Sequence, residues 1–445
     1  MPRREVNAGA RPPARLRRAR AAVSAIFFVH GAVFASWAAR VPAVKDELHL
    51  SAGVLGLVLA GPGLGALAGS QLGGAMVDRF GGRAVSASAP VVLCAPLGLV
   101  PAADSAWPLL CLLAVLGAAD GCTSVAMNAQ AVVVQERYGR TVLNSLHAIR
   151  SIGAVAGGLA GAATALLGLT LAAQFALTAV ALAAVSAVAA GGLLPEAEAG
   201  RRQAGAQAVG EERIADEPVA GQAQAASSAG RAEARAGAPV GQGAQGRKTV
   251  LLLAVMVFLA ALVSDAPASW SGVYLRHVGA DAATAAAGYA AFSAGEVCTR
   301  LFNDRLVNRF GWVRLIRSGT LGCATVLAAA LMAGHPAAAM AAFVAAGAGI
   351  SAVFPGAFTA AGSLPRPGPA MGHLGFAGNA GWLAVSPLVG GLATLVGLPA
   401  ALGVLVVAAL AIAALAPVTR PKATGGAGAP LLSAREEKRE GKEPR

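Results

Sequence analysis

Charged and aromatic residues are scarce in this sequence. Of its 445 residues, 13% are Asp, Glu, Lys or Arg and 5% are aromatic, whereas 56% are hydrophobic. The mean hydropathy is +0.63. A soluble globular chain carries about 25% charged residues, so this composition excludes a soluble protein. It is typical of a chain whose helices lie in a lipid bilayer.

Motifs of several enzyme classes are also absent. The sequence has no GxxxxGK[ST] phosphate loop, no HExxH metalloprotease motif and no CxxC pair. Its five cysteines stand in apolar stretches without the spacing of a disulfide framework or a metal site. The sparse polar residues do not supply the parts of a catalytic triad. We therefore expect no enzyme activity, no metal and no cofactor, with a proton gradient as the energy source.

The net charge of +13 is concentrated in the N-terminal tail and in short connections between apolar stretches. A nucleic-acid interface has a basic stripe interleaved with aromatics, which this sequence lacks, so we expect no nucleic-acid partner. The arginine-rich segments RFGGR, ERYGR and NRFGWVRLIR occupy alternate connections, all on one side of the membrane. The positive-inside rule then predicts a multi-pass protein of a bacterial-type inner (plasma) membrane with both termini in the cytoplasm.

Twelve apolar stretches are long enough to cross a bilayer core of about 30 Å. They cover residues 21–42, 51–77, 84–103, 107–133, 143–168, 171–194, 249–275, 282–303, 313–333, 336–362, 370–396 and 399–418. This predicts an all-α membrane protein with twelve transmembrane helices in two pseudo-symmetric six-helix bundles. The predicted parts are a basic cytoplasmic tail (1–20), an N-terminal bundle (21–194), a flexible cytoplasmic linker (195–248), a C-terminal bundle (249–419) and a charged cytoplasmic tail (420–445).

An internal repeat supports the two-bundle prediction. The segment VDRFGGR (77–83) returns as VNRFGWVR (307–314), each copy at the end of an apolar stretch. The same register aligns Gly65 with Gly295, Gly117 with Gly347 and, with a slip of one residue, GAATALLGL (161–169) with GLATLVGL (391–398). The offset is far longer than the periods of solenoids and propellers, so it indicates a duplicated domain. Parallel duplication of a helix bundle is a known transporter architecture.

Polar residues inside the predicted helices mark a candidate site, because an ionisable group at bilayer depth costs about 2.5–3.5 kcal/mol on insertion scales. Asp120 lies near the middle of the fourth predicted helix, with Asn128 two turns later and Gln130 just beyond. His147 and Arg150 lie near the cytoplasmic end of the fifth, at the depth of Asn128. We predict a substrate or proton site, in which Asp120 titrates and Arg150 tunes it or holds an anionic or hydroxylated substrate. The alternative is a salt bridge that only locks the two helices together.

Further candidates for the same cavity lie on other helices. Asp265 precedes Pro267 in the seventh predicted helix, and we expect Pro267 to interrupt that helix, as at gates and binding sites. A hinge without a binding role is the alternative. The remaining candidates are His30 and Trp37 in the first predicted helix and Asn379 in the eleventh.

The segment GGAMVDRFGGR (73–83) resembles the loop between the second and third helices of the major facilitator superfamily, GxxxDRxGRR, with Gly82 in place of one arginine. More narrowly, ASWAARVPAVKDELHLS, VAMNAQAVVVQERYGRTVLNSLHAIRSIGA, WSGVYLRHVGA and GYAAFSAGEVCTRLFNDRLVNRFG are similar to the fucose-permease-like branch, in particular to YbjJ-like inner-membrane proteins. This chain has Ser124 and Arg150 where that branch usually has an acidic and an aromatic residue. The departures imply a retuned substrate or coupling mode.

The resemblance also implies an inner gate. Asp78 closes the second predicted helix, and the second copy of the motif has Asn308 at the matching place. Glu296 and Arg300 are spaced i, i+4, which favours an ion pair with a structural or gating role. The predicted gate consists of Asp78, Arg79, Arg83, Glu296, Arg300, Asp304, Arg305 and Arg309.

The function implied by the resemblance is a secondary transporter that moves a small molecule by alternating access, coupled to protons and active as a monomer. Asp120 is the first candidate for the proton carrier and Asp265 the second. Few aromatics favour import of a polar metabolite such as a sugar, whereas the glycines between 153 and 161 favour export. An alternative from a different class is a transport-inactive membrane sensor or scaffold that recruits partners through the linker and the C-terminal tail.

Overall fold

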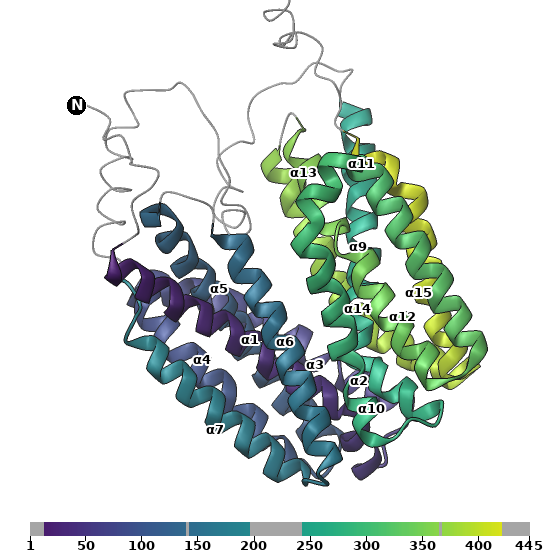
Figure 1. The fold of residues 1–445 in the computed structure, drawn as a ribbon, viewed down its shortest axis with the longest axis horizontal. Helices are drawn as coiled ribbons and strands as arrows, with labels where there is room; N and C mark the ends of the chain where they lie inside the picture. Colours follow the sequence, from purple (N-terminus) through teal and green to yellow (C-terminus); the bar gives the residue numbers. More distant parts are fainter. Residues whose placement is uncertain (1–12, 139–141, 196–242, 365–366, 421–445) are drawn as a thin grey trace, which may run out of the picture.

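The computed structural model describes residues 13–138, 142–195, 243–364 and 367–420, and every regular element in these ranges is helical (Figure 1). The first part of the chain, residues 13–195, forms α1 (Ala14–Glu47), α2 (Ala52–Val58), α3 (Gly61–Phe80), α4 (Gly82–Leu99), η1 (Val100–Ala102), α5 (Ala106–Tyr138), α6 (Leu143–Leu166) and α7 (Leu171–Ala190). The second part, residues 243–420, forms α9 (Gly243–His277), α10 (Ala282–Ala286), α11 (Gly288–Ala333), α12 (Pro336–Ile350), α13 (Val353–Gly362), α14 (Pro367–Val396), α15 (Leu398–Leu415) and η3 (Ala416–Thr419). Most of the predicted tails and linker lies outside the described residues.

Eleven helices in these ranges are long and apolar enough to cross a membrane, with α2–α3 and α12–α13 each counted as one. The prediction of a multi-pass helical membrane protein is therefore confirmed. The predicted span at 282–303 is not among the eleven. It falls in α10 and the start of α11, where Glu296 and Arg300 lower the hydropathy.

Two helices extend beyond the predicted spans. α1 begins at Ala14 rather than near residue 21, because the arginines, leucine and alanines of this stretch are good helix formers and stand directly after Pro13. The prediction that Pro267 interrupts its helix was wrong, since α9 continues through it from Gly243 to His277. A proline removes one backbone hydrogen bond, and close burial by neighbouring helices keeps the chain helical there.

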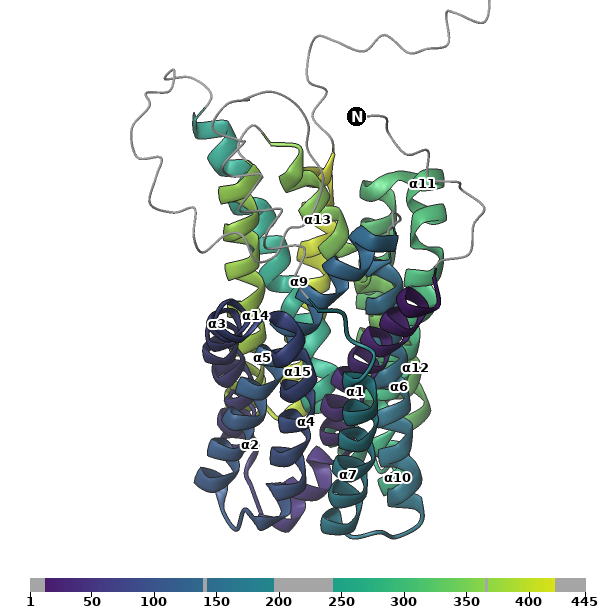
Figure 2. The same cartoon turned by 90° about the vertical axis from the view of Figure 1, so that its left-hand side faces the viewer.

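The two parts lie side by side (Figure 1). α1 and α3–α7 form one group of helices, and α9 and α11–α15 form the other. The groups meet through α2 against α14, through α6 against α10 and α11, and through α1 against α9. Both views place α2 and α10 at one end of the molecule and α13 at the other (Figure 1, Figure 2).

The glycines matched in the internal repeat make equivalent contacts in the two parts. A Cβ atom on Gly65 of α3 would collide with the backbone oxygen of Ala114 in α5, and one on Gly295 of α11 would collide with that of Val344 in α12. The reciprocal contacts are Gly117 with Pro62 and Gly347 with Phe292. Small residues let helices in a bilayer approach closely, so the repeat in sequence is also a repeat in helix contacts.

The turns of the two parts are matched as well. Gly81 and Gly311 end the repeated RFG motif with φ of 84° and 76°. Gly168 and Gly397 end the second repeated stretch with φ of 68° and 82°. Residues with a Cβ atom rarely adopt such angles, so glycine is required at the same places in both copies.

Candidate functional site

A buried imidazole and a half-buried carboxylate face each other between α1 and α5. His30 Nε2 lies 3.0 Å from Asp120 Oδ1, and the side chains are 8% and 28% exposed. Within the described ranges neither ring nitrogen of His30 meets hydrogen-bond geometry, so the attraction is electrostatic rather than a well-aligned hydrogen bond. Asp120 is the more accessible member of the pair.

Glycine contacts between helices set the positions of these side chains. Gly117 and Gly121 hold one face of α5 against α3, which leaves Asp120 on the side that meets α1. Gly31 of α1 approaches the backbone oxygen of Arg150 in α6 so closely that a Cβ atom would collide with it. This crossing places the neighbours of both residues close together.

The crossing of α1 and α6 brings in His147. Its ring stands edge-on to Phe27 of α1, with centroids 5.2 Å apart and an interplanar angle of 88°. His30, Arg150 and Arg300 all lie within electrostatic range of His147. The structure therefore brings together four of the residues predicted for the first part of the chain, namely His30, Asp120, His147 and Arg150.

A charged group between α6 and α11 joins the two parts of the chain. Arg300 of α11 donates a hydrogen bond of 3.0 Å to the hydroxyl of Ser151 in α6. One turn earlier in α11, Glu296 forms an ion pair with Arg300, which confirms the pair expected from the i, i+4 spacing. Arg300 thus lies beside the site rather than at the ends of the helices.

Asp265 and Tyr289 extend this group on the second part. Asp265 of α9 is half-buried, and no hydrogen-bond or ion-pair partner contacts its carboxylate in the part of the chain that the structure describes. Tyr289 of α11 lies within electrostatic range of Asp265, Arg150 and Glu296. The sequence reasoning overlooked Tyr289, although one of only three tyrosines inside an apolar stretch was an available signal.

Two predicted members of the site have other partners. Trp37 is 2% exposed and packs against Phe175 of α7, with ring centroids 6.3 Å apart. Gln130 is fully buried, and its amide donates to the backbone oxygen of Leu194 over 3.3 Å. Both side chains stabilise contacts with the α7 region of the first part.

Asn128 and Asn379 stay apart from the central group. Asn128 is half-buried on the side of α5 that carries Asp120, but its amide donates to the oxygen of Ser124 in its own helix over 2.8 Å. Asn379 is exposed on α14. In the described ranges, no group of three His, Cys, Asp or Glu side chains is placed to hold a metal ion.

Four of the residues predicted for the gate lie in the two copies of the repeated motif, namely Asp78, Arg79, Arg83 and Arg309. Asp78, Arg79 and Arg83 are exposed, and Asp78 forms no ion pair with any described residue. Arg305 is exposed as well, and the side chain of Asp304 lies outside the described residues.

The motif repeats one local contact. The guanidinium of Arg79 lies 5.4 Å from the ring centroid of Phe80, and that of Arg309 lies 5.4 Å from the centroid of Phe310. The local geometry of the motif is thus the same in both parts, although Asp78 is replaced by Asn308.

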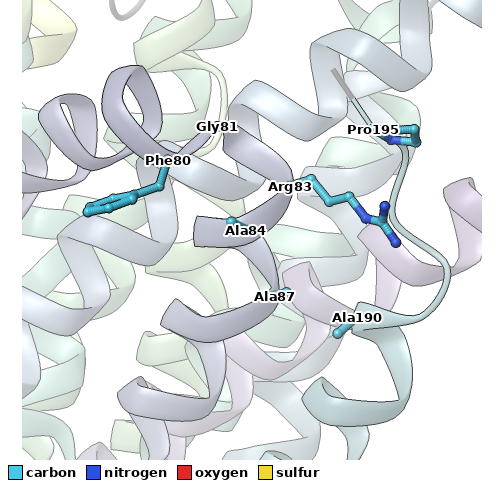
Figure 3. Close-up of a pocket in the computed structure, with 7 residues that line it drawn as sticks. All are labelled: Phe80, Gly81, Arg83, Ala84, Ala87, Ala190 and Pro195. Carbon is cyan, nitrogen blue, oxygen red and sulfur yellow. The ribbon is translucent and has the colours of Figure 1, made fainter. Parts of the chain in front are cut away.

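An open hollow of about 440 Å³ lies beside the first copy of the motif (Figure 3). Its lining consists of Phe80, Gly81, Arg83, Ala84, Ala87, Ala190 and Pro195. The Arg83 side chain points toward the segment that carries Pro195, while Phe80 points away from it (Figure 3). The hollow contains none of the residues of the central group.

Comparisons with known sequences agree with this architecture. The sequence is 30% identical over 396 residues to an MFS-type transporter of Yersinia pestis, covering 88% of this chain and 93% of that one. It is 31% identical over 346 residues to the transporter y4wD of Sinorhizobium fredii, covering 76% and 81%. It is 27% identical over 396 residues to the membrane protein MosC of Rhizobium meliloti, covering 86% and 85%.

Solved structures and a family model point the same way. The nucleoside transporter NupG matches with a TM-score of 0.67 and 13% identity over 90% of this chain and 98% of its own. The D-xylose-proton symporter matches with a TM-score of 0.67 and 15% identity over 92% and 100%. At these identities the likeness shows the fold alone. The family model of the Major Facilitator Superfamily matches residues 22–368, and the chain belongs to that superfamily of membrane transporters.

Proposed function

We propose that this chain is a secondary transporter that moves a small polar molecule by alternating access and couples the movement to protons. The pair of His30 and Asp120 carries the proposal. Both side chains are ionisable, both lie inside membrane helices, and a charge at that depth has to be paired or neutralised. Protonation of Asp120 removes the attraction to His30, so it links proton binding to the contact between α1 and α5.

The contacts between the two parts support alternating access. Gly56 of α2 touches the backbone of Ser386 in α14, and Gly158 of α6 touches Ala290 at the start of α11. These contacts lie toward the end that holds α2 and α10, away from the arginine-rich motifs. We propose that this is an inward-facing conformation, closed on the outer side, in which the exposed Asp78 is separated from the second part.

In the proposed organisation, two six-helix bundles lie in a bacterial-type inner membrane, and both termini lie in the cytoplasm. Its twelfth span consists of α10 and the part of α11 before Gly311. The quoted motifs support a place in the fucose-permease-like branch. We propose that the transporter acts as a monomer, without a cofactor and without enzyme activity.

Two similar structures bear on the substrate. They are named as a nucleoside transporter and a D-xylose-proton symporter, which favours a hydroxylated substrate and import. The glycines of α6 pack against α1, since Gly153 and Gly157 touch the backbones of Phe28 and Ala32. They therefore have a structural use in either direction of transport, and they no longer favour export.

Reconstitution in proteoliposomes tests the proposal. A panel of nucleosides, pentoses, hexoses and sugar acids is offered with and without an inward proton gradient. We expect accumulation of at least one compound, loss of accumulation with a protonophore, and loss of gradient dependence in Asp120→Asn. The exposed Asp104 supplies the control, since Asp104→Asn should behave as wild type. Accumulation that ignores both the protonophore and Asp120→Asn overturns proton coupling at this site.

A further inference from the structure

We infer that the transported molecule is a small monocarboxylate, bound by Arg150 and Arg300 between the two parts of the chain. The inference rests on the proposed function and narrows its substrate class. It depends on the charges that face one another where α6 meets α11.

Arg150 is a cation without a counter-ion. Its guanidinium is half-buried in α6, and it forms no hydrogen bond or ion pair with any residue that the structure describes. Its backbone is held by the close approach of Gly31, so the residue cannot slide along α1. An unpaired guanidinium at bilayer depth is energetically unfavourable. A bound anion offsets that cost.

Arg300 supplies a second guanidinium from the opposite part. It lies within electrostatic range of Arg150. Glu296 neutralises one of the two positive charges, and the hydroxyl of Ser151 accepts one hydrogen bond from Arg300. The group therefore has one positive charge in excess, which matches a monoanion rather than a dianion.

Among the described residues, no other carboxylate neutralises this excess by direct contact. Asp120 faces His30. Asp265 of α9 forms no ion pair with a described residue. His147 adds no negative charge in either of its protonation states. A carboxylate suits the unpartnered guanidinium of Arg150, because a planar guanidinium fork binds both carboxylate oxygens, and the remaining positive charge of Arg300 adds to the attraction.

One aromatic side chain, Tyr289, lies near both guanidinium groups. Tyr289 stacks on Phe292 with centroids 6.2 Å apart and stands edge-on to Phe34 of α1 at 6.3 Å. Tyr289 also lies within electrostatic range of Arg150. Ring faces of this kind cover the apolar side of a sugar or another ring. A carboxylate attached to a small ring therefore matches both the positive charge of the guanidinium groups and the aromatic ring of Tyr289.

The test compares each carboxylate with a neutral analogue. Purified full-length protein in lipid nanodiscs is heated in the presence of glucuronate or glucose, galacturonate or galactose, nicotinate or nicotinamide, and acetate or acetamide. We expect at least one carboxylate to raise the melting temperature above its neutral partner, since a ligand that binds the folded state stabilises it. The rise should disappear in Arg150→Gln and persist in Arg137→Gln, because Arg137 lies at the end of α5 and contacts Pro195.

A second measurement avoids reliance on variants. Phenylglyoxal modifies free guanidinium groups, and peptide mass spectrometry reports the modification of Arg150 separately. We expect the stabilising carboxylate to protect Arg150, while Arg137 is modified at an unchanged rate. A panel in which no carboxylate exceeds its neutral partner, or protection that spares Arg150, overturns the inference.

The proposed function is judged by separate results. Suppose that the protein takes up a neutral compound along the proton gradient and that Arg150→Gln does not reduce this uptake. This result overturns the monocarboxylate inference and supports the proposed transport function. Binding of a carboxylate at Arg150 without any gradient-driven uptake supports the anion site and overturns coupled transport.

Discussion

The imidazole of His30 and the carboxylate of Asp120 face each other across α1 and α5, with a nitrogen-to-oxygen distance of 3.0 Å. Both helices of the pair lie next to the contact with the second part of the chain. α1 contacts α9 directly, and α5 contacts α6, which in turn contacts α10 and α11. Loss of charge on either member therefore changes a contact next to the site, not a remote surface.

His30→Gln should uncouple transport without abolishing binding. Glutamine keeps a polar side chain in α1 but cannot be protonated, so the attraction to Asp120 is lost in all states. We expect downhill exchange of substrate to continue while gradient-driven accumulation falls at least tenfold. Counterflow and pH-jump assays on the same vesicles separate the two activities, and His335→Gln, at the exposed start of α12, is the matched control. Equal loss of both activities would contradict a coupling role.

Glu296→Gln should destabilise the protein through Arg300. The variant removes the negative charge beside a partly buried guanidinium, and we expect a cost of about 1–3 kcal/mol, below the value for a fully buried pair because Arg300 is 32% exposed. Lys45→Gln removes the more exposed pair with Asp46 and should cost about 0–1 kcal/mol. Thermal melts in one detergent compare the two. Equal decreases in melting temperature for the two variants would show that the Glu296–Arg300 pair contributes no more than a surface ion pair.

Gly65→Ala and Gly295→Ala should destabilise the two parts to similar degrees. In each variant the added methyl group meets a backbone oxygen of the facing helix, and overpacking of this kind costs about 1–3 kcal/mol. Gly74→Ala adds the same methyl group to α3 where no atom lies within 4 Å, so its melting temperature should stay near that of wild type. A Gly74 variant as unstable as the other two would contradict the packing argument.

Asp78→Asn should shift the resting population toward the inward-open state, whereas Asn308→Asp should do much less. The two positions match in the repeat, but only the first carries an acid that can contact cations of the other part when the inner side closes. Such a contact at an exposed site stabilises by about 0.3–1 kcal/mol. Labelling of single cysteines at the inner and outer ends measures the population. Equal shifts in the two variants would refute the asymmetry.

Asp281 should make the start of α10 sensitive to acid. Its carboxylate accepts hydrogen bonds from the backbone and hydroxyl of Thr284, at 2.7 and 3.0 Å, and these bonds hold the pKa of Asp281 below its usual value. A lowered pKa in the folded state gives a stabilisation that is complete above the unfolded pKa of about 3.9 and is lost as the pH falls through the folded pKa. Hydrogen exchange over residues 282–286, corrected for intrinsic rates, should rise at low pH in wild type and show no such rise in Asp281→Asn.

The sequence predicted the helical membrane architecture because apolar stretches of this length and glycines in a fixed register leave few other folds. It also predicted the Glu296–Arg300 pair, since that contact depends only on spacing within one helix. The His30–Asp120 pair could not be predicted from the sequence, because the pairing depends on where α1 crosses α5 and α6. Gln130 shows the same limit. Its position near Asn128 suggested a shared cavity, but it lies on another face of α5 and contacts Leu194.

The matched glycine contacts have a consequence for how the two parts tolerate change. Gly65 and Gly295, like Gly81 and Gly311, are required by backbone geometry in both copies, whereas the ionisable residues near the junction have no counterparts at the matching positions. In a scan of all single substitutions, the matched glycines should therefore be intolerant of change in both parts of the chain. An ionisable residue near the junction should be intolerant in one part, while the matching position in the other part tolerates change. The two copies of the repeat thus share their backbone contacts, while their ionisable residues differ.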